Sequence, residues 1–186
     1  MMLQLSILIG LGLIVLSVVW STLKTGSPPV PTSPSVLHTM MSLLPARLPS
    51  CGPDAGHENI VELGSGWGGV AFALAKRYPE HRIVGYELSI LPFVVSRMRL
   101  ALWPRTNLRF RRTNFLSADL SRVVLAVCYL APQSMAGLSA KVQAELPTGA
   151  LVLCNTFSFR SWQERDHKTA PDMYRSPVYL YQIGDN

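Results

Sequence analysis

The hydrophobic pattern divides the chain into a uniformly apolar beginning and a longer part in which two periodicities alternate. Short apolar runs typical of buried strands lie at 59–63, 81–88, 108–115, 123–130, 149–157 and 176–183. Stretches with apolar residues three and four apart predict helices at 35–45, 68–79, 90–102 and 135–146. Ser35 is a candidate cap for the first of these helices, and Pro45 is a stop signal at its end.

Strands that alternate with helices favour an α/β fold with a doubly wound, mostly parallel sheet. In such sheets ligands bind beyond the carboxyl ends of the strands. We therefore expect the functional residues of this chain directly after its predicted strands.

The first residues carry a different signal. Residues 1–23 contain no charged side chain, and Lys24 is the first one. This length predicts a transmembrane anchor at 1–24, with Trp20 near a membrane interface. A cleaved signal peptide lacks support because neither a basic start nor a small-residue cleavage site is evident, and a helix apolar on all faces suits lipid better than a domain surface.

A Pro/Ser linker is predicted at 25–35, and one domain at 36–186. Basic residues follow the apolar segment and none precedes it. By the positive-inside rule, we expect a single-pass membrane protein whose domain faces the cytoplasm or an organelle matrix.

Charge and cysteine content narrow the choice of partner. The net charge is +6, and six arginines gather between Arg97 and Arg112 without an intervening acid. They form either a solvated face or a contact for anionic lipid headgroups. Nucleic acid is disfavoured because no aromatic-rich RNA-binding motif accompanies them. The three cysteines are far apart, with no spacing that predicts a metal site.

A glycine-rich loop follows the first predicted strand, in the segment IVELGSGWGGVAF at 60–72. Its GSGWGG satisfies the dinucleotide pattern G-x-G-x-x-G, but that pattern alone is weak. Glu62, at the end of the strand, would repel a pyrophosphate and suits a cationic amino group. The chain after the loop is too short for a second nucleotide half plus a substrate domain, and no Lys-Ser/Thr follows to make a P-loop.

Two further polar residues follow predicted strands. Glu87, in IVGYELS, lies about 20 residues beyond the loop, where a carboxylate accepts hydrogen bonds from the hydroxyls of a ribose. Its alternative is a surface acid that caps the next helix. Asn114, in RRTNFLSADL, either reads an adenine edge through its amide or is an ordinary turn residue.

Together the motifs VELGSGWGG, VGYELS and TNFLSADL resemble the first three motifs of class I, seven-β-strand methyltransferases that depend on S-adenosyl-L-methionine. The resemblance extends from about Val30 onward. Within that superfamily the chain is similar to membrane-anchored protein-lysine methyltransferases that act on the ATP synthase c-subunit and the adenine nucleotide translocase. PPVPTSPSVLHTMM, VCYLAPQSM and FSFRSW also match this branch.

The resemblance implies a cofactor role for individual positions. Glu62 and the loop backbone would hold the methionine part, Glu87 the ribose and Asn114 the adenine, with 30–32 as a flap over the cofactor. The full set of implied cofactor contacts is Thr32, Glu62, Gly64, Ser65, Gly66, Gly68, Glu87, Leu88, Asn114 and Phe115. Trp67 stands where many relatives have an acid, and we expect its indole to form an apolar lid over the loop.

Methyl transfer to a lysine needs alignment and a water-poor mouth that lowers the pKa of the amine. Aromatic faces can also hold the cationic amine as it approaches. Tyr129, Phe157 and Trp162, with Phe159, are the candidates for such a mouth, and core packing is the alternative for each. The expected function is transfer to a lysine of a membrane-proximal protein. A lipid or small amphiphile as acceptor, and a non-catalytic binding module, stay open.

Overall fold

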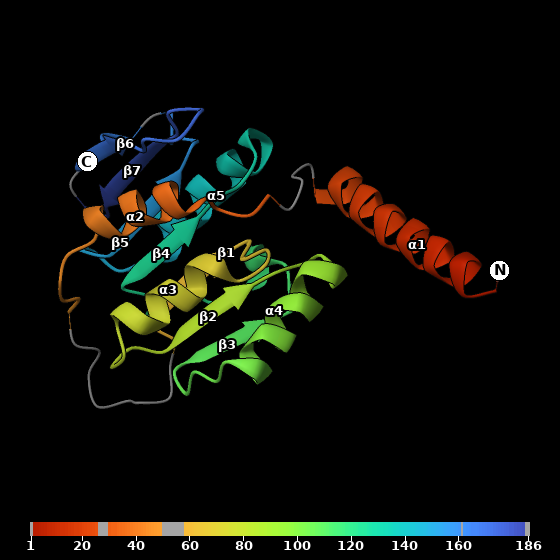
Figure 1. Ribbon diagram of the computed structural model, residues 1–186. Coiled ribbons are helices and arrows are strands. Elements are labelled where there is room, and N and C mark those ends of the chain that lie inside the picture. Colours follow the sequence, from red (N-terminus) through yellow and green to blue (C-terminus); the bar gives the residue numbers. More distant parts are fainter. Residues whose placement is uncertain (1, 26–29, 50–57, 161, 185–186) are drawn as a thin grey trace.

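The computed structural model describes residues 2–25, 30–49, 58–160 and 162–184 (Figure 1). The segments before the sheet are α1 (Met2–Thr25) and α2 (Pro34–Leu43). The remaining elements are β1 (Ile60–Leu63), α3 (Gly69–Arg77), β2 (Ile83–Tyr86), α4 (Ile90–Leu102), β3 (Leu108–Arg111), η1 (Phe115–Ser117), β4 (Leu125–Cys128), α5 (Pro132–Glu145), β5 (Leu151–Asn155), β6 (Asp166–Thr169) and β7 (Pro177–Gln182).

The strands form one sheet in the order β3-β2-β1-β4-β5-β7-β6. β1 to β5 run parallel, whereas β7 lies antiparallel to both β5 and β6. The order reverses between β1 and β4, which is the switch point where an open α/β sheet binds ligands. The predicted doubly wound, mostly parallel sheet is confirmed.

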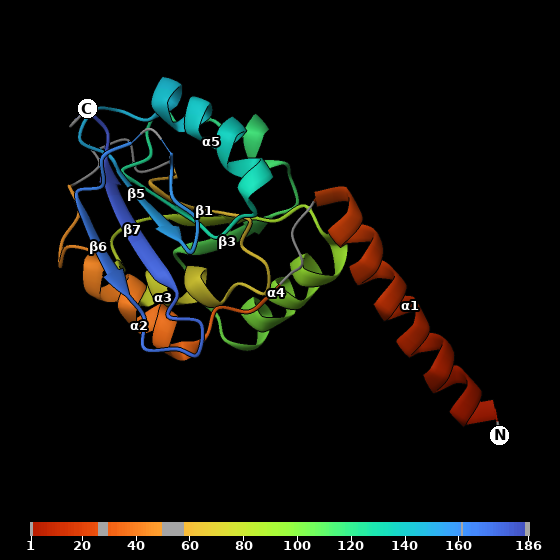
Figure 2. The ribbon, with the colours of Figure 1, turned by 90° about the horizontal axis from the view of Figure 1, so that it is seen from above.

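Helices cover both faces of the sheet (Figure 2). α2, α3 and α4 lie on one face, and α5 with η1 lies on the other. Met40 and Leu74 are fully buried in the core under the first face, and Leu120 and Leu138 are fully buried under the second. The central strands β1, β2 and β4 are buried along their whole length, which explains their unbroken apolar runs.

Two predicted details at the edges of the fold need correction. α2 begins at Pro34 with Ser33 as its cap, so Ser35 is already inside the helix. The Ser33 hydroxyl accepts a hydrogen bond from the Val36 amide, and Pro34 fits the first turn because its missing N–H needs no partner there. β6 was not predicted, because DHKT is exposed throughout and carries no apolar pattern.

α1 is a 24-residue helix that projects from the domain (Figures 1 and 2). Its carboxyl end lies beside α4, and its amino end points away from the sheet. Among the residues that the structure describes, no helix is both long and apolar enough to cross a membrane. The predicted transmembrane segment therefore has no support in the structure, and the predicted location stays a prediction.

Candidate functional site

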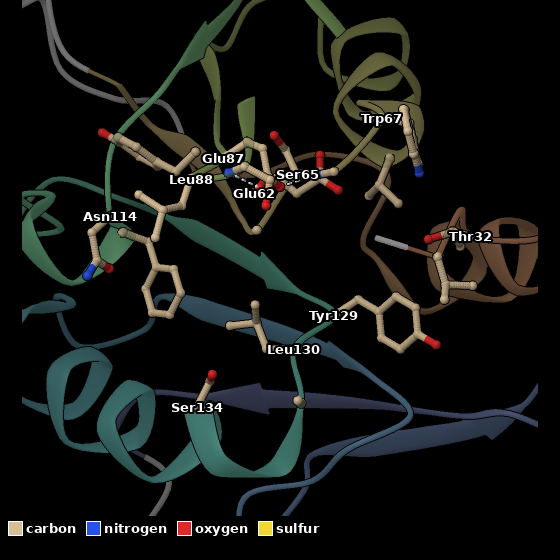
Figure 3. Close-up of a pocket in the computed structure, with 18 of the residues that line it drawn as sticks. Thr32, Glu62, Ser65, Trp67, Glu87, Leu88, Asn114, Tyr129, Leu130 and Ser134 are labelled. Atoms are coloured by element: carbon tan, nitrogen blue, oxygen red, sulfur yellow. Dashed lines mark hydrogen bonds between the residues drawn. The ribbon is translucent and has the colours of Figure 1, made fainter. Parts of the chain in front are cut away.

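A cavity of about 700 Å³ opens at the carboxyl ends of β1, β2 and β4. Figure 3 shows Glu62, Ser65 and Glu87 close together on one side, with Tyr129 and Leu130 facing them. Asn114 lies at one end of the cavity, and Trp67 and Thr32 lie at the other. The polar residues expected after separate strands are thus brought together at the switch point of the sheet.

The glycine loop needs its glycines for two different reasons. Gly64, Gly66 and Gly68 all have positive φ, which side chains rarely adopt. A Cβ at Gly66 would meet nothing within 4 Å, so its backbone faces open space in the cavity. A Cβ at Gly68 would lie 2.7 Å from Cζ of Phe110, so this glycine allows α3 to pack against β3. Of the predicted cofactor contacts, only Gly68 is not in the cavity wall.

This difference gives a matched pair of variants. We expect Gly68→Ala to lower the free energy of unfolding by about 2–3 kcal/mol, because overpacking adds to left-handed strain. Gly66→Ala should cost about 1 kcal/mol, since only the strain remains. Urea denaturation followed by circular dichroism measures both values. Equal losses would mean that the contact with Phe110 relaxes freely.

Glu87 fixes the glycine loop against the next turn of the chain. Its Oε2 accepts a hydrogen bond from the Gly66 amide at 2.7 Å, and its Oε1 accepts one from the Ser89 amide at 2.7 Å. The side chain is buried at the cavity wall. Each carboxylate oxygen has a second lone pair, so Glu87 can still accept two hydrogen bonds from a ligand.

Glu62 lies beneath the loop as a buried acid. Its Oε2 and the Ser65 hydroxyl are the described buried side-chain atoms that have no hydrogen-bond partner. Burial raises the pKa of Glu62 well above its usual 4.5, and the Glu87 charge raises it further, while a hydrogen bond from the Ala71 backbone opposes the shift. A buried acceptor without a donor, beside a second carboxylate, is suited to a cationic donor from a ligand.

Asn114 lies in the cavity wall, but its side chain also has a local role. Its Oδ1 accepts a hydrogen bond from the Leu116 amide at 3.0 Å and so caps η1. Phe115 and Leu116 follow it into the wall. The turn role and the adenine role predicted for Asn114 are compatible, because an amide oxygen accepts two hydrogen bonds.

The predicted aromatic mouth is only partly assembled at the cavity. Tyr129 and Phe157 line it and are half-buried. Trp162 is buried in the core instead, with its ring 4.7 Å from Phe159 and 5.8 Å from Tyr181. A place in the core is the alternative that the sequence left open for Trp162 and Phe159, and it leaves Tyr129 and Phe157 as the aromatic residues of the mouth.

The backbone before Phe157 is strained. Thr156 has a φ of 68°, which is rare for a β-branched residue. Its amide donates a hydrogen bond to the Pro177 carbonyl at 2.7 Å, and its hydroxyl donates one to Oδ1 of the buried Asn155 at 3.2 Å. These bonds hold the turn that directs Phe157 into the cavity.

Trp67 and the segment at 30–32 close the cavity from the amino-terminal side. Both line the wall, and Trp67 is half-buried with Thr32 on the same side (Figure 3). The Arg99 guanidinium donates a hydrogen bond to the Trp67 carbonyl at 2.7 Å, which ties the loop to α4. This placement is compatible with the predicted apolar lid.

Several wall residues were missed by sequence reasoning. They are Tyr86, Arg99, Leu130, Gln133, Ser134 and Gly137. The turn after β4 could have been recognised from its position, because it occupies the same edge of the sheet as the glycine loop. Arg99 and Gly137 gave no such signal, since both lie inside helices and reach the cavity only through the packing of α4 and α5.

Comparison with known proteins identifies relatives over most of the domain. Residues 62–166 match the family model of the ANTKMT methyltransferase domain. The lysine N-methyltransferase of Xenopus laevis named for the ATP synthase c-subunit is 31% identical over 128 residues, which are 67% of this chain and 54% of the relative. The chain thus spans about half the length of this relative.

Two other comparisons cover nearly the whole of the matched protein. A protein-lysine N-methyltransferase of Saccharolobus islandicus (strain REY15A) is 24% identical over 164 residues, which are 86% of this chain and 95% of the relative. An RNA methyltransferase from Salinibacter ruber, solved with S-adenosyl-L-homocysteine, matches with a TM-score of 0.66 and 22% identity. It covers 84% of this chain and 95% of the neighbour, and at this identity it shows the fold alone.

Proposed function

Since the chain belongs to the ANTKMT methyltransferase domain family, we propose that it transfers a methyl group from S-adenosyl-L-methionine to a lysine amine of a membrane-proximal protein. The observation that carries the proposal is the pair of buried carboxylates Glu62 and Glu87 beside the open backbone of Gly66. Relatives named as lysine methyltransferases support the choice of acceptor.

The residues of the cavity fit S-adenosyl-L-methionine, the cofactor of this family. Glu62 Oε2 lacks a donor, and the amino group of the methionine part supplies one together with a positive charge. Glu87 has lone pairs left for the two ribose hydroxyls, and Asn114 lies at the opposite end, where the adenine would reach. A volume of about 700 Å³ is within the usual range for ligand sites.

When bound, the cofactor supplies a methyl group already activated by its sulfonium, so the protein mainly aligns the acceptor and excludes water. Tyr129 and Phe157 form an aromatic rim on the acceptor side. Their rings would hold a cationic amine as it approaches and then favour loss of its proton by removing water. The proton leaves the amine before its lone pair attacks the methyl carbon.

A labelling experiment tests this function. Membranes from cells that lack the gene are incubated with the purified chain and S-adenosyl-L-methionine carrying a labelled methyl group. We expect label in a protein band and methyl-lysine after acid hydrolysis, and Glu87→Ala protein serves as the inactive control. Label in the lipid extract would favour a lipid acceptor. Cofactor binding without any transfer would favour a non-catalytic module.

The lipid acceptor is kept as a second candidate because the cavity rim is apolar. Val30, Leu88 and Leu116 all line the cavity and are exposed at its opening. An amphiphile could rest on these side chains while its polar end enters the site. The labelling experiment separates this acceptor from a lysine because the two products partition differently.

We also propose that α1 attaches the protein to a membrane. Its described large apolar side chains are mostly exposed, including Leu5, Leu8, Leu16 and Trp20. At 1.5 Å per residue the helix is about 36 Å long. Such an apolar helix projecting from a domain is more stable in contact with lipid than in water. Resistance of the membrane-bound chain to alkaline extraction tests the attachment.

A further inference from the structure

The outer face of α4 carries an apolar stripe that the proposed reaction does not use. Ile90, Val94, Met98 and Leu102 are spaced four residues apart and so lie along one side of the helix. Their exposed fractions are 60%, 43%, 59% and 68%. Trp103, directly after the helix, is also exposed. We call these five residues the α4 stripe.

The opposite side of α4 is already occupied by the domain. Pro92 and Ser96 are buried, and Phe93 and Leu100 pack against the core. α4 is therefore apolar toward the sheet and apolar away from it. A helix that is apolar on both sides normally has a second partner. The exposed positions of α5 offer a contrast, because they carry no large apolar side chain and include Gln133, Ala136, Ala140 and Gln143.

The α4 stripe continues into two other apolar surfaces. At its amino end it meets the cavity rim, where Leu88 and Leu116 are exposed. α1 contacts α4, so the apolar side chains of both helices belong to the same side of the molecule (Figure 2). Of the exposed large apolar side chains that the structure describes, only Met173 and Tyr174 lie elsewhere, in the turn between β6 and β7.

The charges around the α4 stripe all have one sign. No acidic residue occurs between Glu87 and Asp119, while this segment contains six arginines. Arg97, Arg105, Arg109 and Arg112 are exposed. Arg97, Arg109 and Arg111 line a shallow hollow of about 490 Å³ between α4 and β3, and Arg111 pairs with Glu58 at 2.6 Å. An apolar face flanked by arginines is complementary to an anionic bilayer surface.

From these observations we propose that the α4 stripe docks into the headgroup region of an anionic membrane, with Arg97 and Arg109 on lipid phosphates. The cavity rim then faces the bilayer. A two-fold dimer through the same face would bring the arginines of both copies together, which disfavours a second copy as the occupant. Attachment through α1 would raise the effective concentration of the face at the membrane, so modest affinity suffices.

Docking deepens the proposed function, because it brings the acceptor side of the cavity to lysines at a membrane surface. The docking itself does not require that the reaction be methyl transfer to lysine. Cofactor binding and methyl transfer can be measured in detergent, apart from any vesicle, so failure of one proposal leaves the other measurable.

Site-specific labelling tests the docking. In a Cys51→Ser background, Met98→Cys, Leu102→Cys and Met173→Cys are each labelled with an environment-sensitive nitrobenzoxadiazole dye; Cys128 and Cys154 are buried thiols. Met173 is the matched control because it is 90% exposed and lies away from α4. The full chain is mixed with vesicles of phosphatidylcholine and phosphatidylglycerol.

We expect dyes at 98 and 102 to become several-fold brighter on the vesicles and to be quenched by lipids with spin labels near the headgroup. The dye at 173 should not change. Adding Met98→Glu to the Leu102→Cys protein should remove most of the increase, whereas adding Met173→Glu should not. Dyes at 98 and 102 that stay in water on vesicle-bound protein would overturn the proposal. So would failure of the chain to bind vesicles, or an increase without vesicles, which indicates self-association.

Discussion

Glu87→Ala is expected to lower the affinity for S-adenosyl-L-methionine by about 100- to 1000-fold, or about 2.7–4 kcal/mol. Hydrogen bonds to a charged group contribute about 1.5–3 kcal/mol each, and under the proposed function Glu87 receives two from the ribose. The variant also removes the acceptor for the Gly66 and Ser89 amides, which loosens the loop that faces the cofactor. Isothermal titration calorimetry measures the loss.

Two further variants define what Glu87 contributes. Glu80→Ala removes an exposed acid at the opposite end of β2 and should leave the affinity unchanged. Glu87→Gln keeps the shape but turns an NH₂ group toward one of the amide donors, so we expect an intermediate loss. Wild-type affinity in Glu87→Ala would contradict the ribose role and leave this acid as a brace for the loop.

Glu62→Gln is expected to act in opposite directions on binding and on stability. The affinity for S-adenosyl-L-methionine should fall by about 10- to 100-fold, because a cationic amino group loses its charged partner. The free energy of unfolding of the cofactor-free protein should rise at neutral pH, because a buried acid that resists ionisation has been removed. Calorimetric titration and thermal unfolding of the same preparations measure both effects.

The sign of the pH dependence follows from the raised pKa of Glu62, which is caused first by burial and then by the Glu87 charge. A group whose pKa is raised on folding contributes stability at pH values below its unfolded pKa. That contribution is lost as the pH rises through the folded pKa. The stability advantage of Glu62→Gln over wild type should therefore grow as the pH rises above about 5.

Cofactor affinity should show the reverse trend. Binding of a cationic amino group favours the ionised form of Glu62, so wild-type affinity should rise with pH until this acid is ionised without ligand. Glu62→Gln should lack this dependence. A variant that is less stable than wild type at pH 8, or that keeps the wild-type pH profile of binding, would show that Glu62 does not act as the buried partner of the ligand.

Much of the fold was predictable because its central strands have one dominant constraint. β1, β2 and β4 are covered on both faces, so their sequences are short apolar runs that end at polar residues. β6 has no buried face, and its pairing with β7 comes from backbone hydrogen bonds that any sequence can make. The cap of α2 was displaced because Ser33 and Ser35 are equally good caps by type, and only the position of Pro34 decides between them.

The candidate site divides along the same line. Glu62, the glycine loop and Glu87 could be found because each directly follows a strand and has a residue type suited to its ligand. Trp162 could not be assigned, because an aromatic residue after β5 suits the mouth of the cavity as well as the core. Its contacts with Phe159 and Tyr181 place it in the core. Gly68 and Gly66 look alike in sequence, and only their neighbours separate packing from ligand contact.

By itself, the sequence determined the alternation of strands and helices, the switch point and the residue types gathered there, because these depend on local periodicity and on chain order. The tertiary structure decided which side chains share a wall, which acid is buried without a partner, and that α4 is apolar away from the sheet as well as toward it. Burial depends on what packs against a residue from distant parts of the chain. No local pattern contains that information.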